Sequence, residues 1–408
     1  MNRTERQNLG IQKWINAGCR GTLEWTTGTG KTYAALTAIK SFLTTNKNKI
    51  ITVIVPTENL KVQWLDKLTK YNLFQYVNVE IINSAIKRND KINFIILDEV
   101  HKIPTNTAIS IFKKRNPDLI LGLSATFNRL DGRHIWLNDL CPVIDTISVK
   151  EAVENNWLST YREYKVLIEP DDIEVFNDYS LKFTEAFSIF NFDFKLAMNC
   201  VTDIVERRKY AKMLGITQSE MTAITFLWKN MLHERKAYIA NHPKKLEIAR
   251  KIIQNRPTSK IITFSSTIKQ AELIGYGITV HSKKTKLQNR ILINDFISKP
   301  SGVINTAKSL DEGIDIPDLD VAIILSNTSS KTQKTQRIGR VIRYEENKVA
   351  EIFNLILKGT NEENWFQKST VNQKFIEINE KELEDVLLYI PTYKIEQEGK
   401  DLDSLFIY

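Results

Sequence analysis

Short apolar runs alternate with amphipathic helical stretches over the first part of the chain. Runs of strand length occupy residues 22–25, 50–55, 77–82, 94–97, 119–123 and 143–147, and helical periodicity follows them. This alternation is typical of a parallel β-sheet with helices on both faces. We therefore predict an α/β domain over residues 1–170.

The pattern changes to long helical periodicity from residue 171 to residue 240, with many aromatic side chains. Aromatic residues at helical spacing most often pack in a core, so we interpret this segment as a helical insertion or bridge. Strand-like runs resume at residues 260–264, 278–280, 303–305, 321–325 and 352–356. They predict a second α/β domain over residues 241–360, followed by a short acidic C-terminal extension over residues 361–408.

Composition narrows the class of protein. Of the 408 residues, 42% are hydrophobic and 26% are charged, which is the balance of a folded globular chain. The three cysteines, Cys19, Cys141 and Cys200, lie far apart, which argues against a disulfide framework and a cysteine-based zinc site. No signal-like segment and no apolar run long enough to cross a membrane occurs, so we expect a cytoplasmic protein without a membrane partner.

Positive charge is concentrated in one region. The chain carries 57 Lys and Arg against 48 Asp and Glu, a net charge of +9. Residues 241–300 contain twelve Lys and Arg against three acids, whereas residues 361–408 contain eleven acids and five lysines. The interpretation from sequence is that a polyanion such as nucleic acid meets the middle of the chain.

A phosphate-binding loop is indicated by WTTGTGKT at residues 25–32, between a strand-like run and a helical stretch. Its glycines allow backbone N–H groups to surround phosphates at a helix N-terminus, Lys31 reaches the β- and γ-phosphates, and the Thr32 hydroxyl is a magnesium ligand. Trp25 stands where the general pattern has its first glycine. The predicted nucleotide-binding residues here are Thr27, Gly28, Thr29, Gly30, Lys31 and Thr32.

Two carboxylates follow the apolar run at residues 94–97 and begin the sequence DEVH. A buried strand would deliver both to the edge of the sheet. Asp98 is predicted to hold Mg²⁺, partly through water, and Glu99 to orient and deprotonate the attacking water. Acids that end a strand are often solvated, but together with the loop they predict hydrolysis of ATP.

With these residues in place the chain resembles the superfamily 2 helicases and translocases over residues 9–356. The further motifs that carry the resemblance are, in order, PT at 56–57, SAT at 124–126, NTA at 305–307 with DEGID at 311–315, and QRIGRVIR at 336–343. The resemblance implies two RecA-like domains that use ATP and Mg²⁺.

The resemblance also implies roles for individual residues. Arg340 and Arg343 would reach across the interdomain cleft to the γ-phosphate, and Gln336 would help to position water or phosphate. Gln12 would read the adenine edge, since its amide can both donate and accept. The remaining residues expected at the nucleotide or in coupling to it are Gly313, Asp315, His101, Ser124 and Thr126.

The nucleic-acid track is expected on the face opposite ATP. The family motifs place it at Pro56, Thr57, Ser84, Ser265 and Thr306, where hydroxyls and backbone N–H groups would bind phosphates without reading bases. The cluster Lys283, Lys284 and Lys286 would add electrostatic attraction, although a run of charges is often only a solvated face.

Two signatures indicate DNA. SATFNRLDG at residues 124–132 and QRIGR at 336–340 resemble DNA-directed members, among them UvsW-type phage helicases and the RecG-like and XPB-like translocases. The expected function is an ATP-driven DNA helicase that acts on forked or branched DNA in replication, recombination or repair. It is expected to be a monomer in the host cytoplasm, encoded by a phage or another mobile element, with replication or recombination proteins as candidate partners. The alternatives are an RNA helicase and a low-turnover, ATP-gated nucleic-acid-binding factor.

Overall fold

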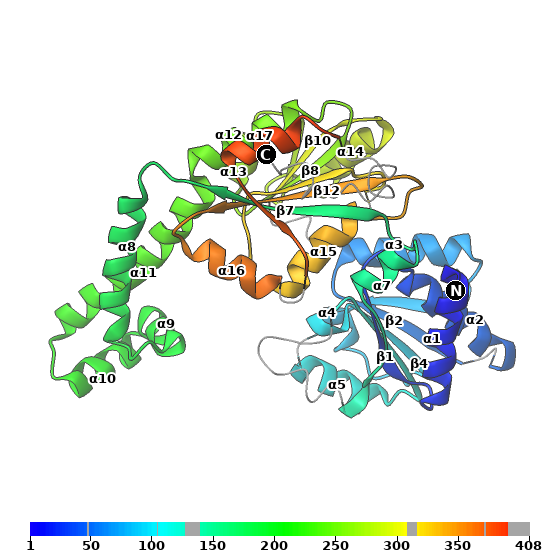
Figure 1. Cartoon of the computed structure of the whole chain (residues 1–408). Helices are drawn as coiled ribbons and strands as arrows, with labels where there is room; N and C mark the ends of the chain where they lie inside the picture. The colour runs from blue at the N-terminus through cyan, green and yellow to red at the C-terminus, as the bar shows by residue number, and fades with distance from the viewer. Residues whose placement is uncertain (47–48, 104, 127–138, 308–315, 371–372, 391–408) are drawn as a thin grey trace.

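The computed structural model describes residues 1–46, 49–103, 105–126, 139–307, 316–370 and 373–390. Over these residues the chain forms two parallel sheets, each covered by helices, and a helical arm that projects from the second (Figure 1). The predicted fold class, two parallel-sheet domains with a helical insertion, is confirmed.

The first sheet has, within the described residues, the strand order β3-β2-β4-β5-β1-β6, with every neighbouring pair parallel. Its centre is almost wholly apolar, as expected for strands covered on both faces. The strands are β1 Arg20–Trp25, β2 Ile51–Val55, β3 Val77–Ile81, β4 Phe94–Asp98, β5 Leu119–Ser124 and β6 Val143–Ile147. The helices are α1 Arg3–Asn16, α2 Lys31–Thr45, α3 Glu58–Lys70, η1 Phe74–Tyr76, α4 Ile82–Ala85, η2 Val100–Lys102, α5 Thr105–Arg115 and α7 Val149–Glu154.

The second sheet has the order β13-β7-β12-β11-β8-β10-β9 and is also parallel throughout its described strands. The strands are β7 Thr160–Ile168, β8 Lys260–Ser265, β9 Ile278–His281, β10 Gly302–Ala307, β11 Val321–Ile324, β12 Val349–Leu357 and β13 Ile376–Asn379. The helices are α12 Pro243–Gln254, α13 Ile268–Leu273, α14 Lys286–Ser298, α15 Lys331–Val341, α16 Asn361–Ser369 and α17 Glu380–Leu387.

The chain enters the second sheet earlier than the predicted boundary at residue 170. β7 pairs with β12 over its whole length, from Thr160 opposite Val349 to Ile168 opposite Leu357. The helical segment therefore leaves from β7 and returns through α12, so both of its ends belong to the second domain (Figure 1). It is an arm of that domain and not a bridge between the two.

The arm consists of α8 Ile173–Ser188, α9 Phe194–Thr202, α10 Ile204–Leu214 and α11 Gln218–Asn241. Its core surrounds Trp228, which is fully buried, and the rings of Phe183, Phe187 and Phe190 lie about it at centroid distances of 6.2, 5.7 and 6.0 Å. Phe194 and Phe226 remain exposed, by 52% and 39%. Several of the arm's aromatic residues thus form its own core, and others remain exposed.

The segment after residue 360 packs onto the second domain in its described part. β13 extends the sheet beside β7, and α17 covers it. Glu362 and Lys245 form an ion pair of 2.6 Å between fully buried side chains, and Glu384 pairs with Lys251. The acidic extension and the basic segment 241–300 therefore partly neutralise each other. None of the described helices is long and apolar enough to serve as a bilayer span.

Candidate active site

The phosphate loop lies at the carboxyl end of the first sheet, between β1 and α2. Gly28 and Gly30 have φ values of 89° and 95°, in the left-handed region that glycine adopts without strain. Lys31 begins α2, and its Nζ donates to the Trp25 carbonyl at 2.7 Å. The Thr29 side chain is buried, and its hydroxyl donates to the Thr26 carbonyl of the same loop at 2.7 Å. The loop presents a helix N-terminus suited to phosphate.

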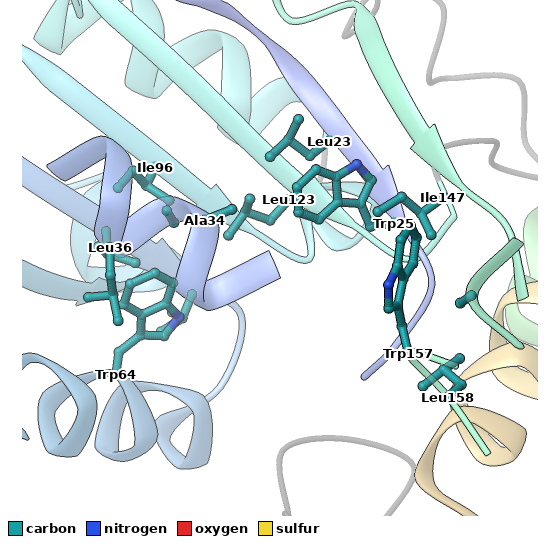
Figure 2. Close-up of a cluster of buried hydrophobic side chains, with 14 of the residues drawn as sticks. Leu23, Trp25, Ala34, Leu36, Trp64, Ile96, Leu123, Ile147, Trp157 and Leu158 are labelled. Carbon is teal, nitrogen blue, oxygen red and sulfur yellow. The ribbon is translucent and has the colours of Figure 1, made fainter. Parts of the chain in front are cut away.

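Trp25 stands at the position where the usual pattern has its first glycine. The loop accommodates it because the side chain points away from the loop into the core. Figure 2 shows its ring beside Leu23 and Ile147, and its Nε1 donates to Asp145 Oδ2 at 2.8 Å. The ring also lies against α1, where a Cβ added to Gly10 would be 2.2 Å from Trp25 Cζ2. The substitution therefore fixes α1 against the loop without filling the phosphate site.

Gln7, and not the predicted Gln12, is the glutamine that contacts the loop. Gln7 is buried and its Nε2 donates to the Thr29 carbonyl at 2.8 Å, and Arg3 contacts the carbonyl of Gly28. Gln12 lies on the exposed side of α1. Five residues correspond to about 500° of helical rotation, so the two glutamines cannot share a face. The apolar positions Ile11 and Trp14 mark the buried face and could have indicated Gln7.

The two acids at the end of β4 are held differently. Both oxygens of Asp98 accept hydrogen bonds, Oδ2 from Trp64 Nε1 at 2.8 Å and Oδ1 from the Glu99 N–H at 3.0 Å. Burial and the adjacent Glu99 carboxylate raise the pKa of Asp98, while Trp64 and Lys31 act in the opposite direction. Glu99 has a φ of 49°, an uncommon backbone conformation for a residue other than glycine.

These residues fit a magnesium ion. Asp98 and Thr32 line the same cavity and offer the carboxylate and hydroxyl oxygens that Mg²⁺ prefers. Burial lowers the pKa of Lys31 and raises that of Asp98, because it disfavours the charged form of each side chain. A negative group near Lys31 and a cation near Asp98 would stabilise both charged forms. Bound phosphates and a divalent cation would supply that charge.

A series of contacts leads from Glu99 to the second domain. His101 Nδ1 lies 3.4 Å from Glu99 Oε2 and 2.8 Å from Ser124 Oγ. Ser124 Oγ also contacts the Thr126 backbone, donating to its carbonyl and accepting from its N–H. Thr126 Oγ1 then donates to Thr332 Oγ1 of α15 at 2.6 Å. The structure thus brings the three predicted coupling residues together and adds Thr332.

The second domain delivers two arginines to the same site. Arg340 near the end of α15 and Arg343 just beyond it line the cavity with Lys31, Asp98 and Glu99. The cavity has a volume of about 550 Å³. α15 approaches the loop so closely that a Cβ on Gly339 would lie 2.6 Å from Thr27 Cβ. Gln336 is buried within α15 and is not one of the residues that line the cavity.

Two contacts position α15 and Arg343 against β7 and the residue that precedes it. Ser159 Oγ donates to the Arg343 carbonyl at 2.8 Å. Lys334 of α15 forms an ion pair of 2.5 Å with Glu163 of β7, and both side chains are buried. Gly313 and Asp315, predicted at the nucleotide, lie outside the described residues, as does residue range 127–132 of the DNA-type signature.

The predicted nucleic-acid contacts differ in accessibility. Pro56 and Thr57 are half-buried after β2, and Ser84 is exposed on α4. Ser265 and Thr306 are buried, and the Thr306 hydroxyl donates to the Thr263 carbonyl at 2.7 Å. Because both side chains are buried, neither presents its hydroxyl to a phosphate at the surface.

The lysine cluster is also divided. Lys284 Nζ donates to the Thr279 carbonyl at 2.6 Å, so this side chain supports the turn after β9. Lys283 and Lys286 are exposed. Only these two members of the predicted cluster present their charge outward.

Comparisons with known families cover both domains. The helicase conserved C-terminal domain matches residues 244–345, and the type III restriction enzyme res subunit matches residues 2–89 and 75–129. The DNA 3'-5' translocase XPB2 of Sulfurisphaera tokodaii is 26% identical over 374 residues, covering 86% of this chain and 80% of that protein. Putative helicase 22 of a Sulfolobus islandicus filamentous virus is 24% identical and matches 83% of this chain, which spans 61% of the viral protein.

The fold has solved counterparts as well. Saccharomyces cerevisiae Dbp5, solved with RNA and ADP BeF3, superposes with a TM-score of 0.60 at 14% identity, covering 94% of this chain and 91% of that chain. Two parallel-sheet domains that share one phosphate-loop cavity define a two-domain RecA-like ATPase. With the family matches in both domains, the chain belongs to the superfamily 2 helicases and is a nucleic-acid-dependent ATPase. A particular relation to UvsW-type or RecG-like helicases stays a prediction.

Proposed function

We propose that this protein is an ATP-driven motor that translocates on DNA. The observation that carries the proposal is the shared cavity, into which the first domain places Lys31, Asp98 and Glu99 and the second domain places Arg340 and Arg343. Because the catalytic groups belong to separate domains, hydrolysis depends on how the domains approach each other.

The site residues divide the chemistry of phosphoryl transfer to water. The loop N–H groups and Lys31 bind the phosphates, and Gln7, which donates to the Thr29 carbonyl, is the glutamine that would read the adenine edge. Glu99 orients a water molecule for attack on the γ-phosphate and accepts its proton, while Arg340 and Arg343 stabilise the charge of the transition state. A magnesium ion held by Asp98 and Thr32 would neutralise phosphate charge.

Coupling to movement would follow the contacts between the domains. The hydrogen bond from Thr126 to Thr332 joins the end of β5 to the helix that carries Arg340. Loss of the γ-phosphate would remove the charge that draws the arginines toward the loop. The domains would then separate, and each cycle would move bound phosphates past the residues after β2 and along the second domain.

DNA is favoured over RNA because the XPB2 relative, whose sequence aligns along most of both chains, is named as a DNA translocase. Forked or branched DNA is the proposed substrate, with the arm bracing the duplex. The exposed rings of Phe192, Phe194 and Phe226 on the arm are suited to stacking against an end base, for about 1–3 kcal/mol per base. Replication, recombination or repair would be the setting.

The deciding experiment is a steady-state ATPase and unwinding assay on matched forked DNA, blunt duplex, single-stranded DNA and RNA. We expect the largest stimulation with forked DNA. Stimulation by RNA alone would identify an RNA helicase instead, and nucleic-acid binding with negligible turnover would identify an ATP-gated binding factor. We further propose that it acts as a cytoplasmic monomer. We also propose that a virus or another mobile element encodes it, and the viral relative supports this origin.

A further inference from the structure

Helix α3 connects the proposed nucleic-acid track with the active site. Its N-cap is Thr57, whose Oγ1 accepts a hydrogen bond from the Leu60 N–H at 3.3 Å. Two turns further on, Trp64 is 2% exposed and its ring points toward Leu36 of α2 (Figure 2). At about 1.5 Å per residue, the seven residues from Thr57 to Trp64 span about 10 Å of rigid helix.

Trp64 provides a side-chain hydrogen-bond donor to the Asp98 carboxylate. Its Nε1 lies 2.8 Å from Asp98 Oδ2, while the other oxygen accepts the Glu99 N–H. The contact joins residues that are 34 positions apart and belong to different elements. The orientation of the proposed metal ligand therefore depends on the position of α3.

Lys67 lies on the same face of α3, three residues after Trp64. It lines the active-site cavity together with Asp98 and Arg343. Burial lowers the pKa of Lys67, with Asp98 raising it and Arg343 lowering it. A displacement of α3 would thus move an indole donor and a cation with respect to the same carboxylate and arginine.

We propose that α3 couples nucleic-acid binding at Thr57 to the metal-dependent binding of nucleotide, with Trp64 acting as the positioning residue that fixes Asp98. The inference rests on the proposed function, because it assumes ATP in the cavity and nucleic acid at the start of α3. Coupling between two sites is a reciprocal free energy, so it can be measured from either ligand.

The test compares Trp64→Phe with Trp14→Phe. Phenylalanine keeps most of the buried ring but removes the indole N–H. Trp14 is the matched control because it is also buried in the first domain, on α1, and its Nε1 donates to the Ile120 carbonyl at 2.8 Å, away from the cavity. Circular dichroism and thermal melting establish that both variants are folded.

Two binding measurements separate a positioning role from a general loss of stability. Fluorescence anisotropy gives the affinity for a fluorescent, non-hydrolysable ATP analogue in Mg²⁺ and in EDTA. The same method gives the affinity for labelled single-stranded DNA with and without saturating nucleotide and Mg²⁺. In Trp64→Phe we expect the Mg²⁺-dependent gain in nucleotide affinity to fall by about tenfold, the size of one hydrogen bond to a charged group, with affinity in EDTA unchanged.

We define the coupling ratio as the DNA affinity with saturating nucleotide and Mg²⁺ divided by the DNA affinity without them. In Trp64→Phe this ratio should fall together with the Mg²⁺-dependent gain in nucleotide affinity, and in Trp14→Phe it should remain at the wild-type value. Lys67→Met should also reduce the ratio, whereas Lys61→Met on the same helix should not, which keeps the proposal testable if Trp64→Phe does not fold. Trp64→Phe behaving as wild type in both assays would overturn the inference alone. Wild-type protein that does not bind the nucleotide in Mg²⁺ would overturn the proposed function itself.

Discussion

Replacing Arg343 by alanine should separate ATP binding from ATP hydrolysis. Arg343 belongs to the second domain but lines the cavity formed with the phosphate loop of the first. Arg343 is half-buried, which lowers the pKa of its guanidinium, and a charge that is shielded from water acts more strongly at short range. Its removal takes away charge stabilisation in the transition state and leaves the loop that binds the phosphates unchanged.

The size of the effect follows from the neighbouring charges. Arginines of this kind contribute about 10³–10⁵ in rate. Arg340 remains in the same cavity, so we expect the lower end of that range, about 10³ in kcat, which is about 4 kcal/mol at 1.36 kcal/mol per tenfold change. ATP affinity should change only several-fold, since the phosphate loop and Lys31 remain in place.

The assay is DNA-stimulated ATP hydrolysis at saturating DNA, with nucleotide affinity measured separately by anisotropy. Lys31→Ala serves as the contrast, because it should weaken binding as well as turnover. Arg290→Ala, on the exposed side of α14, is the control for loss of an arginine away from the cavity. Turnover of Arg343→Ala at the wild-type rate would show that the role given to this arginine is wrong.

Three further predictions test other parts of the molecule. Replacing both exposed lysines, Lys283 and Lys286, by alanine should lower the slope of log affinity against log salt by about 0.7–0.9 for each phosphate that the variant no longer neutralises, as measured by DNA titrations at several salt concentrations. Gln7→Ala should raise the KM for ATP by about tenfold while Gln12→Ala leaves it within about twofold, and equal effects would contradict the assignment. Gly10→Ala should lower the free energy of unfolding by about 1–3 kcal/mol in urea titrations, because its Cβ would overlap the tryptophan ring of the phosphate loop.

The sequence predicts the two sheets well because most strands are continuous apolar runs. β7 was not predicted, for a physical reason. Its sequence TYREYKVLI contains charged residues, and one of them, Glu163, is buried and balanced by Lys334, which lies far away in the sequence. A buried charge with a distant partner gives no local signal, so the strand and with it the domain boundary could not be placed.

The active site shows the same division between local and long-range information. The loop and the DEVH acids are local motifs, and the structure brings them into one cavity with the arginines of the second domain. Trp64 and Thr332 act through contacts with Asp98 and Thr126, which only the folded chain creates. Thr306 shows the reverse, since a family motif placed it on the nucleic-acid track but its hydroxyl is used inside the sheet.

The location of positive charge is where the fold changes the interpretation of the sequence most. Several of the basic residues between 241 and 300 are not available to a polyanion: Lys245 pairs with Glu362, and Arg256 pairs with Glu351 at 2.6 Å while also donating to the Leu387 carbonyl. These charges hold the C-terminal segment on the second domain. Under the proposed function, attraction to DNA from this segment would come from its smaller number of exposed cations, such as Lys283. The salt dependence of binding should consequently be weaker than the net charge of the segment implies.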